Sequence, residues 1–145
     1  MSPHQTGLHS YQVNDISTSN QGQLILMLYD GALQAVNQSI QCMSRKEIAE
    51  QSRHILKAQD IINELSSALD MKLGGEVAKT LEQLYQFVLN QLIQANITSD
   101  TLYLESIIKV LTPLRDAWSR INAATTDDDT AQESHPPATR FAAKC

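Results

Sequence analysis

The scarcity of helix-breaking residues is the feature of this sequence that most constrains its fold. Between residues 20 and 124, Pro113 is the only proline, and glycine occurs at only four positions. Because proline and glycine most often interrupt regular structure, this stretch favours long helices. Apolar residues recur there at intervals of three and four, and no segment alternates apolar and polar residues between hairpin-type turns. This spacing predicts amphipathic helices and no strands.

Residues that favour helix ends divide this stretch into four predicted helices. Asn20 and Gln23 have the spacing of a capping box at the start of the first helix, and Ser99 or Asp100 can cap the last. The glycine pair at 74–75 makes a tight reversal possible between the second and third helices. Four helices joined by short loops are most economically arranged as an all-α, antiparallel four-helix bundle. The predicted helices span residues 20–43, 47–71, 76–96 and 100–121.

Charge and composition exclude several classes of protein. The 145 residues carry a formal net charge of −5 and their basic residues are scattered, so no nucleic-acid partner is expected. The longest uninterrupted apolar run, Leu24–Tyr29, is far shorter than the roughly 20 residues that cross a bilayer. The first ten residues lack the basic start and apolar stretch of a signal peptide. No direct membrane insertion is therefore predicted, and the expected location is the cytoplasm.

Reactive groups are not clustered in the sequence. The patterns of a P-loop, a dinucleotide-binding glycine fingerprint, a zinc-protease helix and a serine-hydrolase elbow are absent. The four histidines are far apart, and the two cysteines, Cys42 and Cys145, cannot build a disulfide framework or a four-ligand zinc site. We therefore predict no catalytic residue, no metal site and no cofactor, and we do not expect an enzyme.

One short fragment keeps a catalytic alternative open. Residues 53–58 read Arg-His-Ile-Leu-Lys-Ala and resemble the His-x-x-Lys-Gly core of histidine phosphotransfer domains, which are also helical bundles. The resemblance implies that His54 accepts a phosphoryl group. Ala58 stands where those domains usually have the glycine that leaves the imidazole open to a partner's aspartate. The other interpretation of His54 is a solvated histidine on the polar side of the second helix.

The first predicted helix is more apolar than one bundle face requires. Leu24–Tyr29 is a run of six apolar residues, which at about 100° per residue point all round the helix. A helix that is apolar on every side must be buried on every side, so something besides the other three helices is expected to pack there. A similar excess occurs on the third and fourth helices, at residues such as Phe87, Ile93 and Leu102.

Two interpretations of this apolar excess remain open. One is a self-assembling structural bundle that buries the surplus by oligomerisation, for example as a homodimer. The other is a groove that accepts an amphipathic helix of a partner protein. In the second interpretation, Tyr11, Val13 and Ile16 of the N-terminal segment can fold back over the groove when no partner is present.

These patterns divide the chain into three segments: a flexible N-terminal lid at residues 1–19, the bundle at 20–124 and an acidic tail at 125–145. The tail is poor in large apolar groups and rich in small, polar, acidic and proline residues. Such a segment cannot offset the entropy cost of ordering by burial, so it is predicted to be disordered.

Several strings of residues in the bundle segment together resemble one known family. Gln23–Leu33 (QLILMLYDGAL) is similar to the first-helix signature of the FliS family, the flagellar secretion chaperones for flagellin. Gly74–Ala78 (GGEVA) resembles the middle block of that family, and Leu114–Trp118 (LRDAW) resembles its last helix. The resemblance covers about residues 11–121 with family-like spacing, although Gln21 stands where the family usually has proline.

This resemblance implies a function and a set of partners. A member of the family is expected to bind the C-terminal segment of flagellin in the cytosol, to prevent premature polymerisation and to deliver it to the flagellar export apparatus. The segment would become ordered as amphipathic helices in an apolar groove, without any nucleotide. We assign Tyr11 and Ile16 to the displaceable lid. The predicted groove contacts are Ile25, Tyr29, Ile62, Leu65, Leu69, Tyr85, Leu89 and Leu92.

Overall fold

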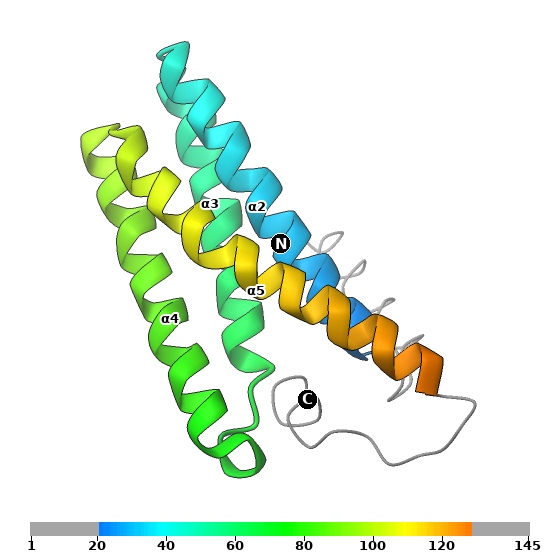
Figure 1. The fold of residues 1–145 in the computed structure, drawn as a ribbon. Coiled ribbons are helices and arrows are strands. Elements are labelled where there is room, and N and C mark those ends of the chain that lie inside the picture. The colour runs from blue at the N-terminus through cyan, green and yellow to red at the C-terminus, as the bar shows by residue number, and fades with distance from the viewer. Residues whose placement is uncertain (1–20, 129–145) are drawn as a thin grey trace, which may run out of the picture.

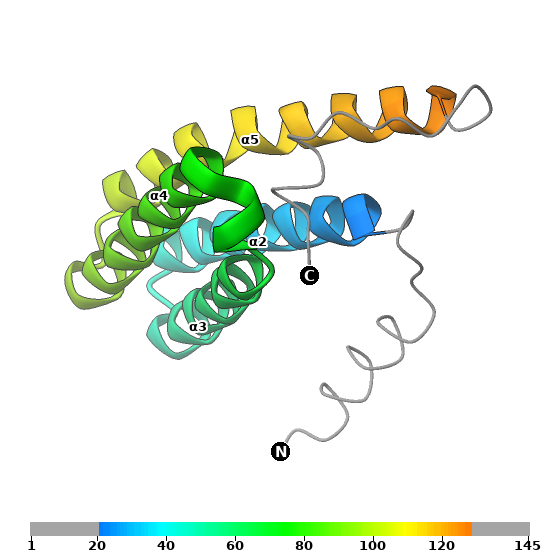
Figure 2. The same ribbon diagram turned by 90° about the horizontal axis from the view of Figure 1, so that it is seen from below.

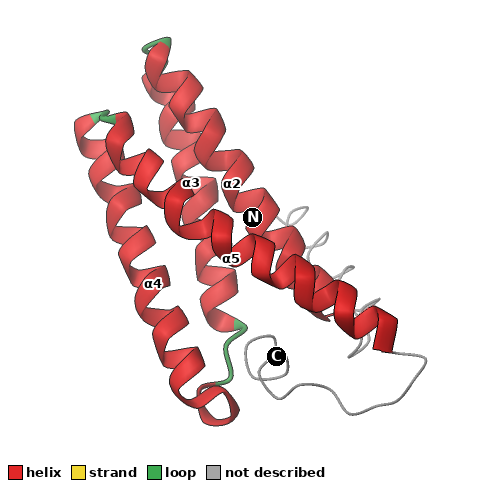
Figure 3. Ribbon diagram, viewed as in Figure 1, coloured by secondary structure: helices red, strands yellow, loops and turns green. Residues whose placement is uncertain are grey.

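The computed structural model describes residues 21–128, with side chains described for residues 21–124. These residues form four helices joined by short loops, and no strand occurs among them (Figure 3). The predicted all-α fold is therefore confirmed. The helices are α2 (Gln21–Ser44), α3 (Ile48–Ser67), α4 (Met71–Thr98) and α5 (Thr101–Asp128).

Most of the two predicted terminal segments lies outside the described residues. This applies to the whole of the lid at residues 1–19 and to the tail from residue 129 onward. The first residues of the predicted tail, 125–128, are instead the last residues of α5.

The four helices form the predicted antiparallel bundle (Figure 1). α2 packs mainly against α3 and α5, and α4 packs mainly against the same two helices, so α2 and α4 occupy opposite corners. The shared core is lined by apolar side chains that recur every three or four residues along each helix. Consecutive helices are antiparallel because the connecting loops are too short to return the chain to the opposite end.

Hydrogen bonds at the loop between α4 and α5 end one helix and begin the next. Ser99 adopts a left-handed conformation (φ 54°) and donates its backbone N–H to the carbonyl oxygen of Ala95 at 2.8 Å. The Asp100 carboxylate accepts the backbone N–H of Leu102 at 2.9 Å, which satisfies a free donor in the first turn of α5. Of the two caps predicted for this helix, Asp100 is the residue that acts.

The turn between α3 and α4 differs from the prediction. α3 ends at Ser67, and Met71, which was predicted to end α3, is the first residue of α4. The reason is Asp70, whose carboxylate accepts the backbone N–H groups of Lys72 at 3.0 Å and Leu73 at 2.9 Å. The Asp70 cap stabilises the start of α4 at Met71. This effect outweighs the apolar spacing that would otherwise extend α3 to the same residue.

Gly75 redirects α4 after its first turn. Its backbone (φ 53°, ψ −129°) is non-helical, while the residues on both sides of it are helical. Residues with a side chain are strained in this conformation, so the position requires glycine. A Cβ atom here would meet no other atom within 4 Å, so crowding plays no part.

We predict that Gly75→Ala lowers the free energy of unfolding by about 1–3 kcal/mol, the usual cost of a strained backbone conformation. Chemical denaturation followed by far-UV circular dichroism measures the loss. Thr80→Ala, at an exposed helical position of α4, is the control and should change stability by about 0.5 kcal/mol or less. Equal stability of Gly75→Ala and the unaltered protein would contradict this assignment of strain.

The two ends of the bundle differ in how closely the helices lie together. The loops that join α2 to α3 and α4 to α5 lie at the same end (Figure 1). At the other end, the first turns of α2 and the last turns of α5 run together, away from α3 and α4 (Figure 1, Figure 2). We call this the divergent end; it comprises residues 21–28 of α2, residues 114–128 of α5 and the turn between α3 and α4.

Direct contacts hold α2 and α5 together. The Arg115 guanidinium donates to the Asp30 carboxylate at 2.7 Å. Nearer the start of α2, Gly22 lies so close to α5 that a Cβ atom there would collide with the side chain of Asn122. The divergent end therefore rests on a paired α2 and α5.

Candidate partner-binding surface

The apolar run at the start of α2 is only partly covered by the bundle. Ile25 and Tyr29 are buried in the core, as the helical period requires. Leu24, Leu26 and Leu28 are half-buried, and the side chain of Met27, which completes the run, is 48% exposed. The prediction that the other three helices cannot cover all six residues is confirmed.

A pair of tyrosines connects α2 and α4 through the core. The hydroxyl groups of Tyr29 and Tyr85 form a hydrogen bond of 2.7 Å, and their ring centroids are 6.4 Å apart at a tilt of 53°. Trp118 of α5 is buried in the same cluster. Burial raises the pKa of both phenols, so both stay neutral and each satisfies the polar group of the other.

Because the tyrosine hydroxyls are each other's partners, removing one leaves the other short of a hydrogen bond. We predict that Tyr29→Phe and Tyr85→Phe each lower the free energy of unfolding by about 1–3 kcal/mol. The double variant should lose less than the sum of the two, because it leaves no unpaired phenol. Denaturant titration of the four proteins gives the coupling energy, and purely additive losses would contradict the pairing.

The raised pKa values of the two phenols also predict a dependence of stability on alkaline pH. Below the ordinary tyrosine pKa of 10.0, folded and unfolded chains hold the same phenolic protons, so the contribution is fully present. As pH rises above this value the unfolded chain ionises first, and the free energy of unfolding falls. Denaturant titrations on both sides of this pH should show a smaller fall in the double Tyr29→Phe, Tyr85→Phe variant. An equal fall would contradict the prediction.

The structure places most of the predicted groove contacts inside the core. All of these residues come from α2, α3, α4 or the turn between α3 and α4, and they contribute to one apolar cluster. Leu69 and Leu89 are half-buried at its edge, and Tyr11 and Ile16 lie outside the described residues. The fully buried members of the predicted set are Ile25, Tyr29, Ile62, Leu65, Tyr85 and Leu92.

Sequence reasoning missed the apolar residues that the bundle leaves accessible at the divergent end and in the adjoining first turns of α4. Leu73 and Val77, on either side of Gly75, are exposed, while Leu114 and Ile121 of α5 are half-buried. In the sequence, Val77, Leu114 and Ile121 look like ordinary members of the apolar period, and Leu73 lies between two predicted helices. Their exposure arises from the kink in α4 and from the course of α5, neither of which the period reveals.

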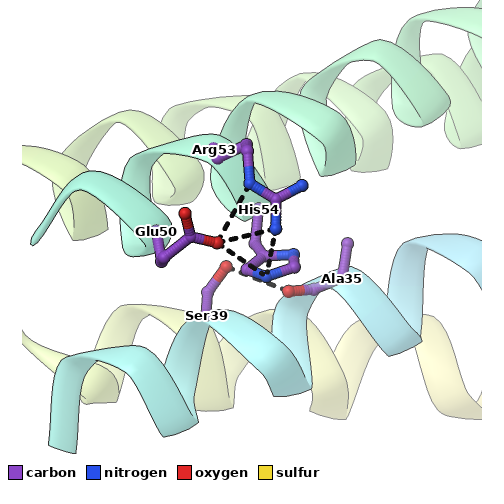
Figure 4. A network of polar contacts seen from close by, with 5 residues as sticks. All are labelled: Ala35, Ser39, Glu50, Arg53 and His54. Atoms are coloured by element: carbon purple, nitrogen blue, oxygen red, sulfur yellow. Dashed lines mark hydrogen bonds and ion pairs between the residues drawn. The ribbon is translucent and has the colours of Figure 1, made fainter. Parts of the chain in front are cut away.

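His54 lies between two helices rather than on a solvated face, which corrects its interpretation as a solvated histidine on the polar side of the second helix. Its side chain is 13% exposed and faces α2, close to Ala35 and Ser39 (Figure 4). Its Nε2 atom lies 3.4 Å from the Arg53 guanidinium and 4.0 Å from the Glu50 carboxylate. The Nδ1 atom is buried without a hydrogen-bond partner.

This environment does not suit a phosphoryl acceptor. A phosphotransfer histidine must present a ring nitrogen to an aspartate of a partner protein, and His54 is packed against α2. The Glu50 carboxylate beside Nε2 is paired with the Arg53 guanidinium at 2.7 Å, so the two charges offset each other at the imidazole. Its pKa is held below the ordinary value by the hydrogen bond and charge of Arg53, so it is ionised near neutral pH.

The described residues contain neither a cluster of metal-ligating side chains nor a helix that could span a membrane. No three His, Cys, Asp or Glu side chains among residues 21–124 converge as metal ligands would. Cys42 is a free, buried thiol of α2. Within residues 21–128, no helix is long and apolar enough to cross a membrane.

Comparison with known proteins places this geometry in context. Residues 4–125 match the family described as "Flagellar protein FliS". The flagellar secretion chaperone FliS of Bacillus subtilis is 32% identical over 111 residues, which are 77% of this chain and 82% of the relative. That of Vibrio cholerae is 34% identical over 108 residues, 74% of this chain and 79% of the relative. FliSB of Pseudomonas aeruginosa is 35% identical over 107 residues, 74% of this chain and 85% of the relative.

The structure defines an all-α helical bundle whose first described helix keeps part of an apolar run uncovered. The sequence matches, which extend over most of the chain, identify its family. The chain belongs to the FliS family of flagellar secretion chaperones.

Proposed function

We propose that this protein binds the C-terminal segment of flagellin in the cytoplasm, prevents its premature polymerisation and assists its delivery to the flagellar export apparatus. The observation that carries the proposal is the uncovered part of the Leu24–Tyr29 run at the divergent end. The secretion-chaperone names of the related proteins supply the class of partner. No nucleotide or other cofactor enters the proposal.

The physical basis of binding is burial of apolar surface. A flagellin segment that folds as an amphipathic helix can place its apolar face on Met27, Leu28 and Leu114 and gain about 25 cal/mol for each Å² removed from water. Ordering the segment opposes this gain, so the net affinity is lower than the buried area suggests. Such a balance suits a chaperone, because the cargo must later be released.

The predicted contact residues take two roles in this proposal. Leu69 and Leu89 are accessible at the edge of the core and contact the cargo directly. The fully buried members of the predicted set, including Tyr29 and Tyr85, hold the helices that carry the surface. Tyr11 and Ile16 cover the same surface when no cargo is bound, which reduces the apolar area open to aggregation.

Binding is tested by mixing the purified protein with the C-terminal segment of flagellin from the same bacterium. Isothermal titration calorimetry measures affinity, and far-UV circular dichroism should show more helix in the mixture than in the separate components. Met27→Glu should weaken binding by about 10-fold or more, since the loss of one buried apolar side chain exceeds about 1.4 kcal/mol.

The matched control is Leu102→Glu, a comparable change of an exposed apolar residue at the start of α5, away from the divergent end. A carboxylate there suits the helix N-terminus, so the fold should be kept. Its affinity should stay within about 2-fold of the unaltered protein, well below the effect of one buried side chain. Absence of binding at concentrations on the order of 10 μM, a Kd that corresponds to about −7 kcal/mol, would refute the proposed function.

A further inference from the structure

Three large aliphatic side chains are exposed around the turn that begins α4. Met71 is 50% exposed, Leu73 53% and Val77 44%. They lie on either side of the kink at Gly75, within about two helical turns of one another. We call these three residues the turn patch. Single exposed aliphatic residues are ordinary on a protein surface, whereas a group of them indicates a contact.

The charges around the turn patch do not select for a charged partner. Between residues 70 and 79, the carboxylates of Asp70 and Glu76 are matched in number by two lysines. The Asp70 carboxylate is also engaged as the cap of α4. Apolar contact is therefore what an occupant of the turn patch must supply.

The turn patch is too small to hold a separate protein molecule by itself. A stable interface between two proteins takes about 20–30 residues on each side. A segment of the same chain needs much less contact area, because its tether holds it at an effective concentration on the order of 1 mM. The size of the patch therefore favours a segment of this chain as its occupant.

The tail beyond α5 carries one large apolar side chain. From residue 129 to 145, Phe141 is the only Phe, Tyr or Trp, and Leu, Ile, Val and Met are absent. Removing a phenyl group from water is favourable wherever apolar surface lies within its reach. Phe141 is thus the one residue of this segment suited to contact the turn patch.

The tail is long enough to bring Phe141 to the turn patch. The Gln91 side-chain amide donates to the Ser106 hydroxyl at 2.8 Å, which marks a point where α4 and α5 lie together. From there both helices run towards the divergent end, α4 for 14 residues to Val77 and α5 for 22 residues to Asp128 (Figure 1). At about 1.5 Å per residue, these two ends would be about 40 Å apart even if the helices crossed at a right angle. The 13 residues from Asp128 to Phe141 extend up to about 43 Å.

The N-terminal segment is the other part of the chain that brings apolar residues to this end. Its Tyr11 and Ile16 precede α2 directly, so the nearest apolar surface to them is the Leu24–Tyr29 run of α2 itself. On α5, no large apolar side chain after Leu102 is exposed among those described up to residue 124. Phe141 therefore finds no well-exposed apolar contact on its own helix, which favours the tail for the turn patch.

We infer that the tail folds back from the end of α5 and places Phe141 on the turn patch, so that the last residues of the chain cover the start of α4. The contact is intramolecular and rests on burial of apolar surface. Because one aromatic side chain supplies most of it, the contact is reversible, and the patch is exposed whenever the tail is displaced.

The oxidation rates of two methionines test this contact in the full-length protein. Met71 lies in the turn patch, and Met27 of α2 is an internal control with nearly the same exposed fraction, 48% against 50%. Dilute hydrogen peroxide converts both to the sulfoxide, and peptide mass spectrometry measures each rate. If the tail covers Met71 at least half of the time, Phe141→Ser should raise its oxidation rate by about 2-fold or more. Neither Met27 in this variant nor either methionine in the matched tail variant Thr139→Ser should change.

A nitroxide label on Cys145 gives an independent measurement. The label reacts there in preference to Cys42, which is buried. It should broaden the methyl NMR signals of Val77 but not those of Leu102, which is exposed near the other end of the bundle. Leu73→Ser removes part of the patch at an exposed position, so the fold should be kept and the broadening at Val77 should fall.

The outcomes identify the occupant of the turn patch. Equal Met71 oxidation rates in the unaltered protein and in Phe141→Ser would overturn the inference. So would a faster rate at Met27 in place of Met71, since Phe141 would then lie on α2. If Tyr11→Ser with Ile16→Ser exposes Met71 and Phe141→Ser does not, the N-terminal segment is the occupant and the tail is not. Protection of Met71 that increases with protein concentration would show a second copy of the chain there, which also contradicts an intramolecular contact.

Discussion

The hydrogen bond between the hydroxyl groups of Tyr29 and Tyr85 is the interaction on which much of this bundle depends. α2 and α4 lie at opposite corners, and the two phenols meet between them in the core. Each would be a costly unsatisfied group if it were buried alone. Their pairing allows two large aromatic side chains to fill the space where α5 begins to leave α4, and Trp118 of α5 completes the cluster.

The course of the helices around this cluster explains why a stable core coexists with uncovered apolar surface. α2 and α5 remain paired through the salt bridge of Asp30 with Arg115 and through the close approach at Gly22, yet α3 and α4 do not follow them. The start of α2 therefore retains more apolar side chains than its neighbours bury. The uncovered apolar surface arises from a mismatch between helix directions.

Some features were readable from the sequence because they depend on local chemistry. The intervals of three and four between apolar residues predicted the helices, and Asp100 was identified as a possible cap from its position alone. The site was less predictable. The same period marks the buried Leu65 and the accessible Leu69, since both serve an apolar interface. His54 was equally ambiguous, because a histidine near charged residues looks solvated until the neighbouring helix is placed against it.

By itself, the sequence determined an all-α bundle, its family and the presence of an apolar run too large for one helix face. Those properties follow from the spacing of apolar residues, from composition and from short strings of residues, all of which can be read within a few turns of helix. Only the tertiary structure decided how α2 and α5 run away from α3 and α4, whereas the Asp70 cap at the start of α4 is a local signal like that of Asp100. It also decided which apolar residues remain accessible, since exposure depends on the directions in which neighbouring helices run.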